Sequence, residues 1–266
     1  MSVVMPYRTD PLHARARRYR RVNLGAVGGV RDLCKAGLMA LVLTLGVAAP
    51  VAANPLDDGV DAEKRGDYAA ALALWRPLAE QGNAAAQFDV GSLYANGYGV
   101  VQDYVEAASW YRKAADQGYA SAQSSLGFMY YAGRGAPQDF DQAATWFQKA
   151  ADQGNASGEF YLGDMYAAGQ SVPQDDAQAA AWYAKAADQG HPAAQFNLAI
   201  LYSRGRGVAQ DPVQALKWYS LAAASFPAAD VEGRTRALNN RDKLAATMTP
   251  AQILEAQTLA RDWKAK

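Results

Sequence analysis

The chain has 266 residues with 26 Lys and Arg and 26 Asp and Glu, so its formal net charge is zero. Residues 1–53 contain 8 of the basic and 2 of the acidic residues, which leaves 18 basic against 24 acidic residues in 54–266. Nucleic-acid binding relies on Lys and Arg to neutralise phosphates, so we expect no nucleic-acid partner for this acidic part. The single cysteine, Cys34, lies before it, which excludes disulfides, thiolate metal sites and cysteine nucleophiles from residues 54–266.

Residues 1–53 resemble an export signal with a long basic leader. An arginine-rich stretch precedes an apolar run of 14 residues, Ala36 to Ala49, and small residues follow up to Ala53. This order is typical of a secretory signal peptide, and the run is shorter than the roughly 20 residues that cross a membrane. We therefore expect cleavage before Asn54, a periplasmic or secreted protein, and membrane contact only through the signal segment. The basic leader fits either a start codon assigned too far upstream or a twin-arginine signal at Arg20-Arg21.

A tripeptide, Asp-Gln-Gly or Glu-Gln-Gly, then recurs every 36 residues, with its glycines at Gly82, Gly118, Gly154 and Gly190. A fixed period of this length is typical of stacked-repeat proteins, in which each unit buries its apolar face against its neighbours. We predict an N-terminal capping hairpin at 54–82, four full repeats at 83–118, 119–154, 155–190 and 191–227, and C-terminal capping helices at 228–266.

Each full repeat is predicted to be two helices joined by a turn. In the first helix Val90 lies four residues before Tyr94, and Leu–Tyr pairs recur at this spacing in the other copies, which places both side chains on one face. A small residue stands between each pair and would let a second helix approach closely: Gly91, Gly127, Gly163 and Ala199. A glycine able to adopt a positive φ ends each first helix, and these are Gly97, Gly133, Gly169 and Gly205.

The second helix of each repeat is expected to begin after an aspartate that is followed three residues later by Glu or Gln, the pattern of a helix N-cap. The four aspartates are Asp103, Asp139, Asp175 and Asp211. In the first repeat Ala107, Trp110 and Ala114 form the apolar stripe of this helix.

Shorter or non-matching helices are predicted at both ends of the array. Residues 57–65 and 66–82 indicate a short helix and its partner. After Pro227 the period fails, and Val231–Thr247 and Thr249–Lys266 indicate two further helices. A solenoid needs such a terminal pair to cover its last apolar face, and the residues expected to do so are Leu244, Ile253, Leu254 and Trp263.

The recurring pattern Ala-Gln-Phe-x-Val/Leu-Gly-x-Leu-Tyr, followed by Gly-x-Gly-Val-x-Gln-Asp and by Trp-Tyr-x-Lys-Ala-Ala-Asp-Gln-Gly, resembles the Sel1-like repeat, a relative of the tetratricopeptide repeat. The resemblance covers Asp57 to about Ser225, and Arg65–Leu72 and Met248–Gln257 are similar to the ends of exported bacterial members. It implies an all-α fold, a right-handed α-solenoid of stacked hairpins, which scaffolds protein complexes in the cell envelope without chemistry of its own. Some cysteine-rich relatives are described as binding or hydrolysing β-lactams, but they carry paired cysteines that residues 54–266 lack.

In tetratricopeptide-like stacks the first helices line the concave surface, so the resemblance places a binding groove there. The residues expected to bind a partner are Phe88, Ser124, Phe160 and Phe196 at one level, Ser92, Phe128, Asp164 and Ile200 at the next, and Asn96, Tyr131, Ser203 and Arg204 near the rim. This mixture suits an extended peptide or a partner helix. Phe88, Phe160 and Phe196 recur, so ordinary packing is the alternative for them.

Few residues after position 53 could carry catalysis. The only histidine there, His191, precedes Pro192 and is predicted to be a turn residue. Metal sites and Ser–His hydrolysis therefore lack parts, and we expect no metal, cofactor or catalytic residue. Asp175-Asp176 is the carboxylate pair that could act on peptidoglycan. The favoured function is a monomeric, non-catalytic envelope scaffold that binds a protein or peptide, and the alternative is a peptidoglycan- or β-lactam-binding protein with or without hydrolytic activity.

Overall fold

The computed structural model describes residues 54–265, and the expected signal peptide lies outside this range. The described residues form twelve helices and no strand. In chain order the helices are α1 (Pro55–Lys64), α2 (Tyr68–Glu80), α3 (Ala84–Asn96), α4 (Tyr104–Asp116), α5 (Ala120–Ala132), α6 (Phe140–Asp152), α7 (Ala156–Ala168), α8 (Asp176–Asp188), α9 (Pro192–Arg204), α10 (Pro212–Ser225), α11 (Val231–Ala245) and α12 (Pro250–Asp262).

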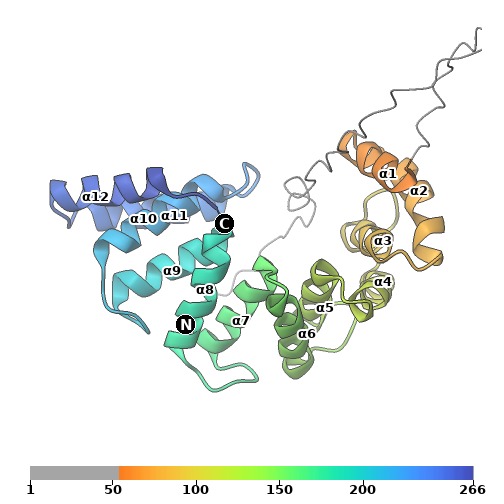
Figure 1. Cartoon of the computed structure of the whole chain (residues 1–266), viewed down its shortest axis with the longest axis horizontal. Coiled ribbons are helices and arrows are strands. Elements are labelled where there is room, and N and C mark those ends of the chain that lie inside the picture. The colour runs from red at the N-terminus through yellow and green to blue at the C-terminus, as the bar shows by residue number, and fades with distance from the viewer. Residues whose placement is uncertain (1–53, 266) are drawn as a thin grey trace, which may run out of the picture.

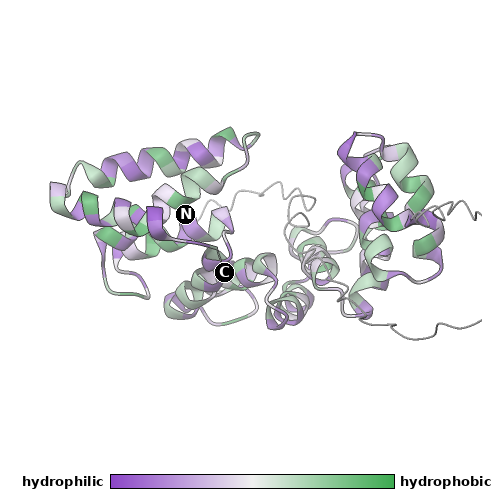
Figure 2. Ribbon diagram, turned by 45° about the horizontal axis from the view of Figure 1, so that its top comes forward, coloured by the Kyte–Doolittle hydropathy of each residue, from purple (hydrophilic) through white to green (hydrophobic). Residues whose placement is uncertain are grey.

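Consecutive helices pack as hairpins, and the hairpins stack in chain order. The stack is an open arc, with α1 and α2 at one end and α10 to α12 at the other (Figure 1). Polar and apolar residues alternate along the helices (Figure 2), as expected when one side packs on neighbours and the other meets solvent. The prediction of an all-α solenoid of stacked hairpins is therefore confirmed.

An aspartate caps the second helix of every full repeat. Its side chain accepts a hydrogen bond of 3.0 Å from the backbone N–H three residues later, in α4, α6, α8 and α10 alike. This bond satisfies one of the backbone donors that a helix leaves unpaired in its first turn. The capping aspartates are Asp103, Asp139, Asp175 and Asp211, as predicted.

Glycines determine how closely the two helices of a repeat approach. A Cβ added to Gly163 would lie 2.6 Å from Cδ1 of the Tyr183 ring, and one added to Gly91 would lie 2.8 Å from the Tyr111 ring. The second-helix ring therefore lies directly across the first-helix backbone. The glycines that end α3, α5, α7 and α9 have φ between 63° and 68°, a left-handed conformation that other residues adopt at a cost.

The last two helices both pack on α10 rather than chiefly on each other. Trp263, just after α12, meets Trp218 of α10 edge-on at 6.3 Å between ring centroids. Leu244 and Trp263 pack against the buried core, as expected. The expectation for Leu254 is wrong, because this side chain is 65% exposed.

Candidate partner-binding surface

The first helices of neighbouring units touch: α5 contacts α7, and α9 contacts α11. Of the twelve residues expected to line this side, seven are at least partly accessible, namely Asn96, Phe128, Tyr131, Asp164, Ile200, Ser203 and Arg204. The other five are interior and only 1–7% exposed, namely Phe88, Ser92, Ser124, Phe160 and Phe196. The expectation that these five present their side chains to a partner is therefore wrong.

The three interior phenylalanines pack on rings of their own and adjacent repeats. The centroid of Phe160 lies 4.6 Å from that of His191 in a stacked arrangement, and Phe196 lies 5.7 Å from Tyr219. Phe88 lies 5.4 Å from Tyr119. Ordinary packing, the alternative interpretation of these residues, is what the structure shows.

At one of the predicted binding positions, the first-helix side chain instead bonds to the adjacent repeat. Oδ1 of Asp164 on α7 accepts a 2.6 Å hydrogen bond from the Tyr183 hydroxyl on α8 and a 3.1 Å bond from Nδ2 of Asn197 on α9. We call such a set, whose second and third members lie 19 and 33 residues after the first, an inter-repeat trio. Sequence reasoning treated the first member as a surface residue and missed the other two.

The inter-repeat trio recurs in the two preceding repeats with different chemistry. In the first, Oγ of Ser92 lies 3.3 Å from the Tyr111 hydroxyl, which Ser125 also hydrogen-bonds. In the second all three residues are aromatic: Phe128 lies 5.6 Å from Tyr161, which stacks on Phe147 at 4.7 Å. In these three repeats polar residues thus accompany the tyrosine and aromatic residues the phenylalanine, whereas the fourth repeat has Ile200 with Tyr219. This covariation was visible in the internal alignment and was the signal that could have found the trio.

The trio around Asp164 holds a perturbed carboxyl. Burial raises the pKa of Asp164 to about 7, although the hydrogen bonds from Tyr183 and Asn197 oppose the shift. The pKa of the half-buried Tyr131 is raised to about 12, first by burial and then by the charge of Asp164. Tyr131 also meets Phe140 edge-on at 5.5 Å. The middle of this side is thus aromatic, with one carboxyl beside it.

A shallow, largely open pocket of about 320 Å³ lies at the C-terminal end of the same side. Its walls come from α9, α10 and the α11 region, and its lining residues are Ser203, Arg204, Tyr219, Asn240, Lys243, Leu244 and Thr247. We call it the α9–α11 pocket. Sequence reasoning identified Ser203 and Arg204 but missed the α11 residues, because the repeat that guided the alignment stops before them.

A second pocket, of about 390 Å³, lies at the joint between α6 and α7, away from the predicted residues. Its lining includes Gln148 and Tyr166. At the preceding joint Arg112 takes the place equivalent to Gln148, and its guanidinium donates to the Tyr130 hydroxyl. Gln148 instead donates to Asp152 at 2.7 Å on its own helix. Gln148 therefore does not bridge its two helices as Arg112 does at the preceding joint.

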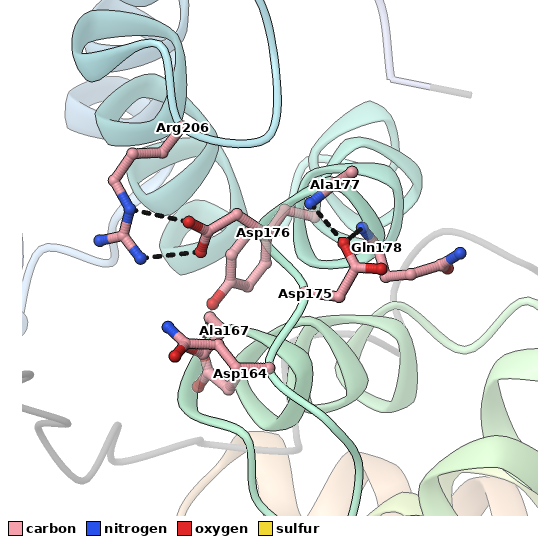
Figure 3. Close-up of polar contacts among 9 residues, drawn as sticks. Asp164, Ala167, Asp175, Asp176, Ala177, Gln178 and Arg206 are labelled. Atoms are coloured by element: carbon pink, nitrogen blue, oxygen red, sulfur yellow. Dashed lines mark hydrogen bonds and ion pairs between the residues drawn. The ribbon is translucent and has the colours of Figure 1, made fainter.

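The adjacent carboxylates at the start of α8 have structural partners (Figure 3). Asp175 is the N-cap and accepts from the N–H groups of Ala177 and Gln178 at 2.8 and 3.0 Å. Asp176 binds Nε and Nη2 of Arg206 at 2.9 and 2.7 Å, which ties α8 to the turn after α9. These carboxylates are thus occupied by a cap and an inter-repeat ion pair.

His191 is a turn residue, as predicted. It is the N-cap of α9, where Nδ1 accepts from the Ala194 N–H at 3.2 Å, and burial lowers its pKa to about 4. Among residues 54–265, no group of three or more His, Cys, Asp and Glu side chains is placed to hold a metal ion. None of the helices in this range is both long and apolar enough to span a bilayer.

The Sel1 repeat model matches the chain five times, at residues 56–83, 84–119, 120–155, 156–191 and 192–225. The chain belongs to the Sel1 repeat family. The first match falls on the shorter α1–α2 unit, which the Sel1 model therefore recognises as a repeat alongside the four full ones. Sel1 repeats generally mediate protein–protein interactions.

Solved structures of Sel1 proteins are similar to this chain. A Sel1 repeat protein from Oxalobacter formigenes is 28% identical, with a TM-score of 0.60 over 79% of this chain and 85% of that one. A protective antigen of uropathogenic Escherichia coli, c5321, is 29% identical, with a TM-score of 0.49 over 79% of this chain and 52% of that one. None of the curated proteins matches this chain.

Proposed function

We propose that this Sel1 protein is a non-catalytic scaffold or adaptor that binds a peptide or partner helix along the side formed by its first helices. The observation that carries the proposal is that recurring and non-recurring residues of the repeat have different roles. The recurring residues are used by caps, turns and packing, whereas the accessible first-helix residues differ between copies. Tyr131, Ile200 and Arg204, for example, share no residue type with their counterparts.

The chemistry of this side supports recognition of a chain rather than of a small molecule. Phe128 and Tyr131 are half-buried aromatic residues on α5, and Ile200 is a half-buried aliphatic residue on α9. Half-buried aromatic residues provide contact area that is already partly ordered, which suits the centre of an interface. Ser203 and Arg204 add polar groups at its end. The side extends over several repeats, as a bound segment of several residues requires.

The proposal includes export. Residues 1–53 would be removed before Asn54, and the protein would act in the bacterial periplasm or outside the cell as a monomer. Support for export comes from the order of a basic flank, a short apolar run and small residues. Amino-terminal sequencing of the protein recovered from each cell fraction would test it, because a protein retained in the cytoplasm with its first residues intact would contradict export.

Site-specific photo-crosslinking in living cells tests the binding side. A photoreactive amino acid is placed in turn at Ala132, Ala168 and Arg204, which are equivalent positions at the C-terminal ends of α5, α7 and α9. Matched controls are Ser109, Thr145 and Ala181, which are equivalent exposed positions on the second helices. The proposal expects one partner protein to be captured from the first set and not from the second. Capture from the second set alone, or from neither set, would reject it.

A further inference from the structure

The α9–α11 pocket carries two cations without counter-ions. Within residues 54–265, neither Arg204 nor Lys243 takes part in an ion pair, and both are exposed. The nearby carboxylate of Asp242 is engaged by Arg241 at 2.8 Å. The pocket is therefore locally positive, although the part of the chain that contains it has more acidic than basic residues.

Neutral polar groups line the same pocket as the two cations. The Tyr219 hydroxyl is hydrogen-bonded by Ser203 and Asn240, and the charge of Arg204 is close enough to act on it. The bond to Tyr219 holds the Asn240 amide, which is itself one of the lining residues. An amide flanked by a guanidinium and an ammonium offers several N–H donors to oxygen acceptors.

The same helix face carries one more cation. Arg236 lies one turn before Asn240 on α11, and its guanidinium carbon is 5.2 Å from the centre of the Phe196 ring on α9. Positions 236, 240 and 243 share one face of α11 by their spacing of four and three residues. Positive charge thus continues along α11 beyond the pocket itself.

Neither of the two cations is needed to form the repeat. Arg204 stands where the other repeats have Asn96, Ala132 and Ala168. Lys243 lies after the last repeat, where the alignment offers no counterpart. The packing and capping that explain recurring residues therefore do not explain this pair of cations.

We propose that the α9–α11 pocket binds the side-chain carboxylates of an acidic peptide segment, with Arg204 and Lys243 each contacting one carboxylate and Asn240 donating between them. The proposal rests on the proposed function and specifies the chemistry of the partner at this end of the binding side. Two separate cations fit an acidic segment better than a single terminal carboxylate, because each can neutralise its own acceptor.

The test measures binding of a fluorescein-labelled hexaglutamate peptide to the protein from residue 54 onward, by fluorescence anisotropy at two salt concentrations. Hexaglutamine and C-terminally amidated hexaglutamate are the comparison peptides. The pocket variant is Arg204→Gln with Lys243→Gln, and the control variant is Arg65→Gln with Lys149→Gln, which removes two exposed positive charges elsewhere. Lys243→Glu is a second pocket variant, and circular dichroism verifies the fold of each.

The proposal expects hexaglutamate to bind and hexaglutamine not to bind. The pocket variant should weaken binding about tenfold, and the control variant should change it less than about twofold, because its two charges lie away from the pocket and their attraction is screened. Amidation should leave binding unchanged. Loss of binding on amidation would show that the pocket binds a terminal carboxylate instead. Equal weakening by the pocket and control variants would show that peptide binding depends only on the net charge of the protein. Either result, or no binding of hexaglutamate, overturns the proposal.

The outcome is separable from that of the scaffold proposal. A partner captured through Ala132 and Ala168 whose binding survives the pocket variant would retain the scaffold function and reject the acidic segment.

Discussion

The hydroxyl of Tyr183 donates a 2.6 Å hydrogen bond to Oδ1 of Asp164, and Asn197 donates to the same oxygen from the next repeat. A carboxyl at the junction of three helices thus accepts from two of them. Burial nevertheless raises its pKa to about 7, because the interior disfavours the charge more than these bonds favour it. This carboxyl therefore changes charge near neutral pH.

Replacing Asp164 with Asn is expected to remove a pH dependence of stability. The pKa of Asp164 is about 7 in the fold against an ordinary value of 3.8. Its favourable contribution to the free energy of unfolding is therefore largely present near pH 4 and is lost as the pH rises from there through 7. On acidification from pH 8 to pH 4, the free energy of unfolding of the wild type should rise by up to about 4 kcal/mol relative to that of Asp164→Asn. Urea unfolding followed by circular dichroism measures this difference.

The comparison between the two proteins isolates Asp164 from other groups. Burial also raises the pKa of Glu159, whose contribution has the same sign. The lowered pKa of His191 acts in the opposite direction, because the fold keeps this histidine neutral and is therefore destabilised as the pH falls. Both groups are present in both proteins. A stability difference that is the same at pH 4 and pH 8 would contradict the assignment.

Gly163→Ala is expected to lower the free energy of unfolding by about 1–3 kcal/mol, because the new methyl group would overlap the Tyr183 ring. The fourth repeat provides the matched control, since Ala199 already occupies the equivalent position in α9 and is fully buried. Ala199→Gly should cost about 1 kcal/mol through helix propensity alone. Chemical denaturation measures both changes. If Gly163→Ala were neutral or stabilising, the glycine would not be required for the approach of α8.

The ion pair between Asp176 and Arg206 is expected to contribute little to stability. The two side chains are 26% and 43% exposed, and pairs of this kind contribute about 0.2–1 kcal/mol. A double-mutant cycle with Asp176→Ala and Arg206→Ala should give a coupling energy in that range, and it should decrease from 0.05 to 0.5 M salt. A coupling above about 2 kcal/mol would instead make this pair the main link between the third and fourth repeats.

Ser171→Gly is expected to stabilise the protein by about 0.5 kcal/mol, because Ser171 has a φ of 61° that glycine adopts without strain. The gain is small because the Ser171 hydroxyl also donates to Asp141, a bond that the substitution removes. Asp141→Ala removes the same bond without changing the backbone and is the control. Thermal unfolding followed by circular dichroism compares the variants, and a larger loss for Ser171→Gly than for Asp141→Ala would contradict the strain argument.

The reverse change at an equivalent turn should be far more damaging. A Cβ added to Gly135 would lie 2.0 Å from the backbone oxygen of Tyr104 in the preceding repeat. Gly135→Ser should therefore lower stability by more than about 2 kcal/mol, through strain and overlap together. If Gly135→Ser and Ser171→Gly changed stability by equal and small amounts, the two turns would have the same spacing from the preceding repeat.

Much of the fold was predictable because local chemistry repeats. The spacing of an aspartate and a Glu or Gln identifies a helix N-cap, and each predicted capping aspartate accepts the expected bond. The same holds for the glycines that face a second-helix ring, such as Gly163. Four copies of one pattern also reveal which positions are interchangeable. These features depend on neighbours within about one repeat, and the sequence contains that information.

The surface was less predictable, because a helix period does not separate a groove-facing side chain from one turned toward the next helix. Ser92 was expected on the surface, yet it is 1% exposed and faces the Tyr111 hydroxyl. The walls of the α9–α11 pocket supplied by Asn240 and Lys243 lay beyond any sequence argument. They depend on how α11 packs on α10, which no recurring copy reports.

The inter-repeat trio makes the order of the units matter. The Tyr111 hydroxyl finds its second partner, Ser125, in the following unit, whereas Phe147 meets the ring of Tyr161 there. Excising residues 119–154 would preserve the backbone period but place Tyr111 against the neighbour suited to Phe147. The units are consequently not interchangeable modules, and shuffling or shortening this array would mismatch its interior even where every turn and cap is kept.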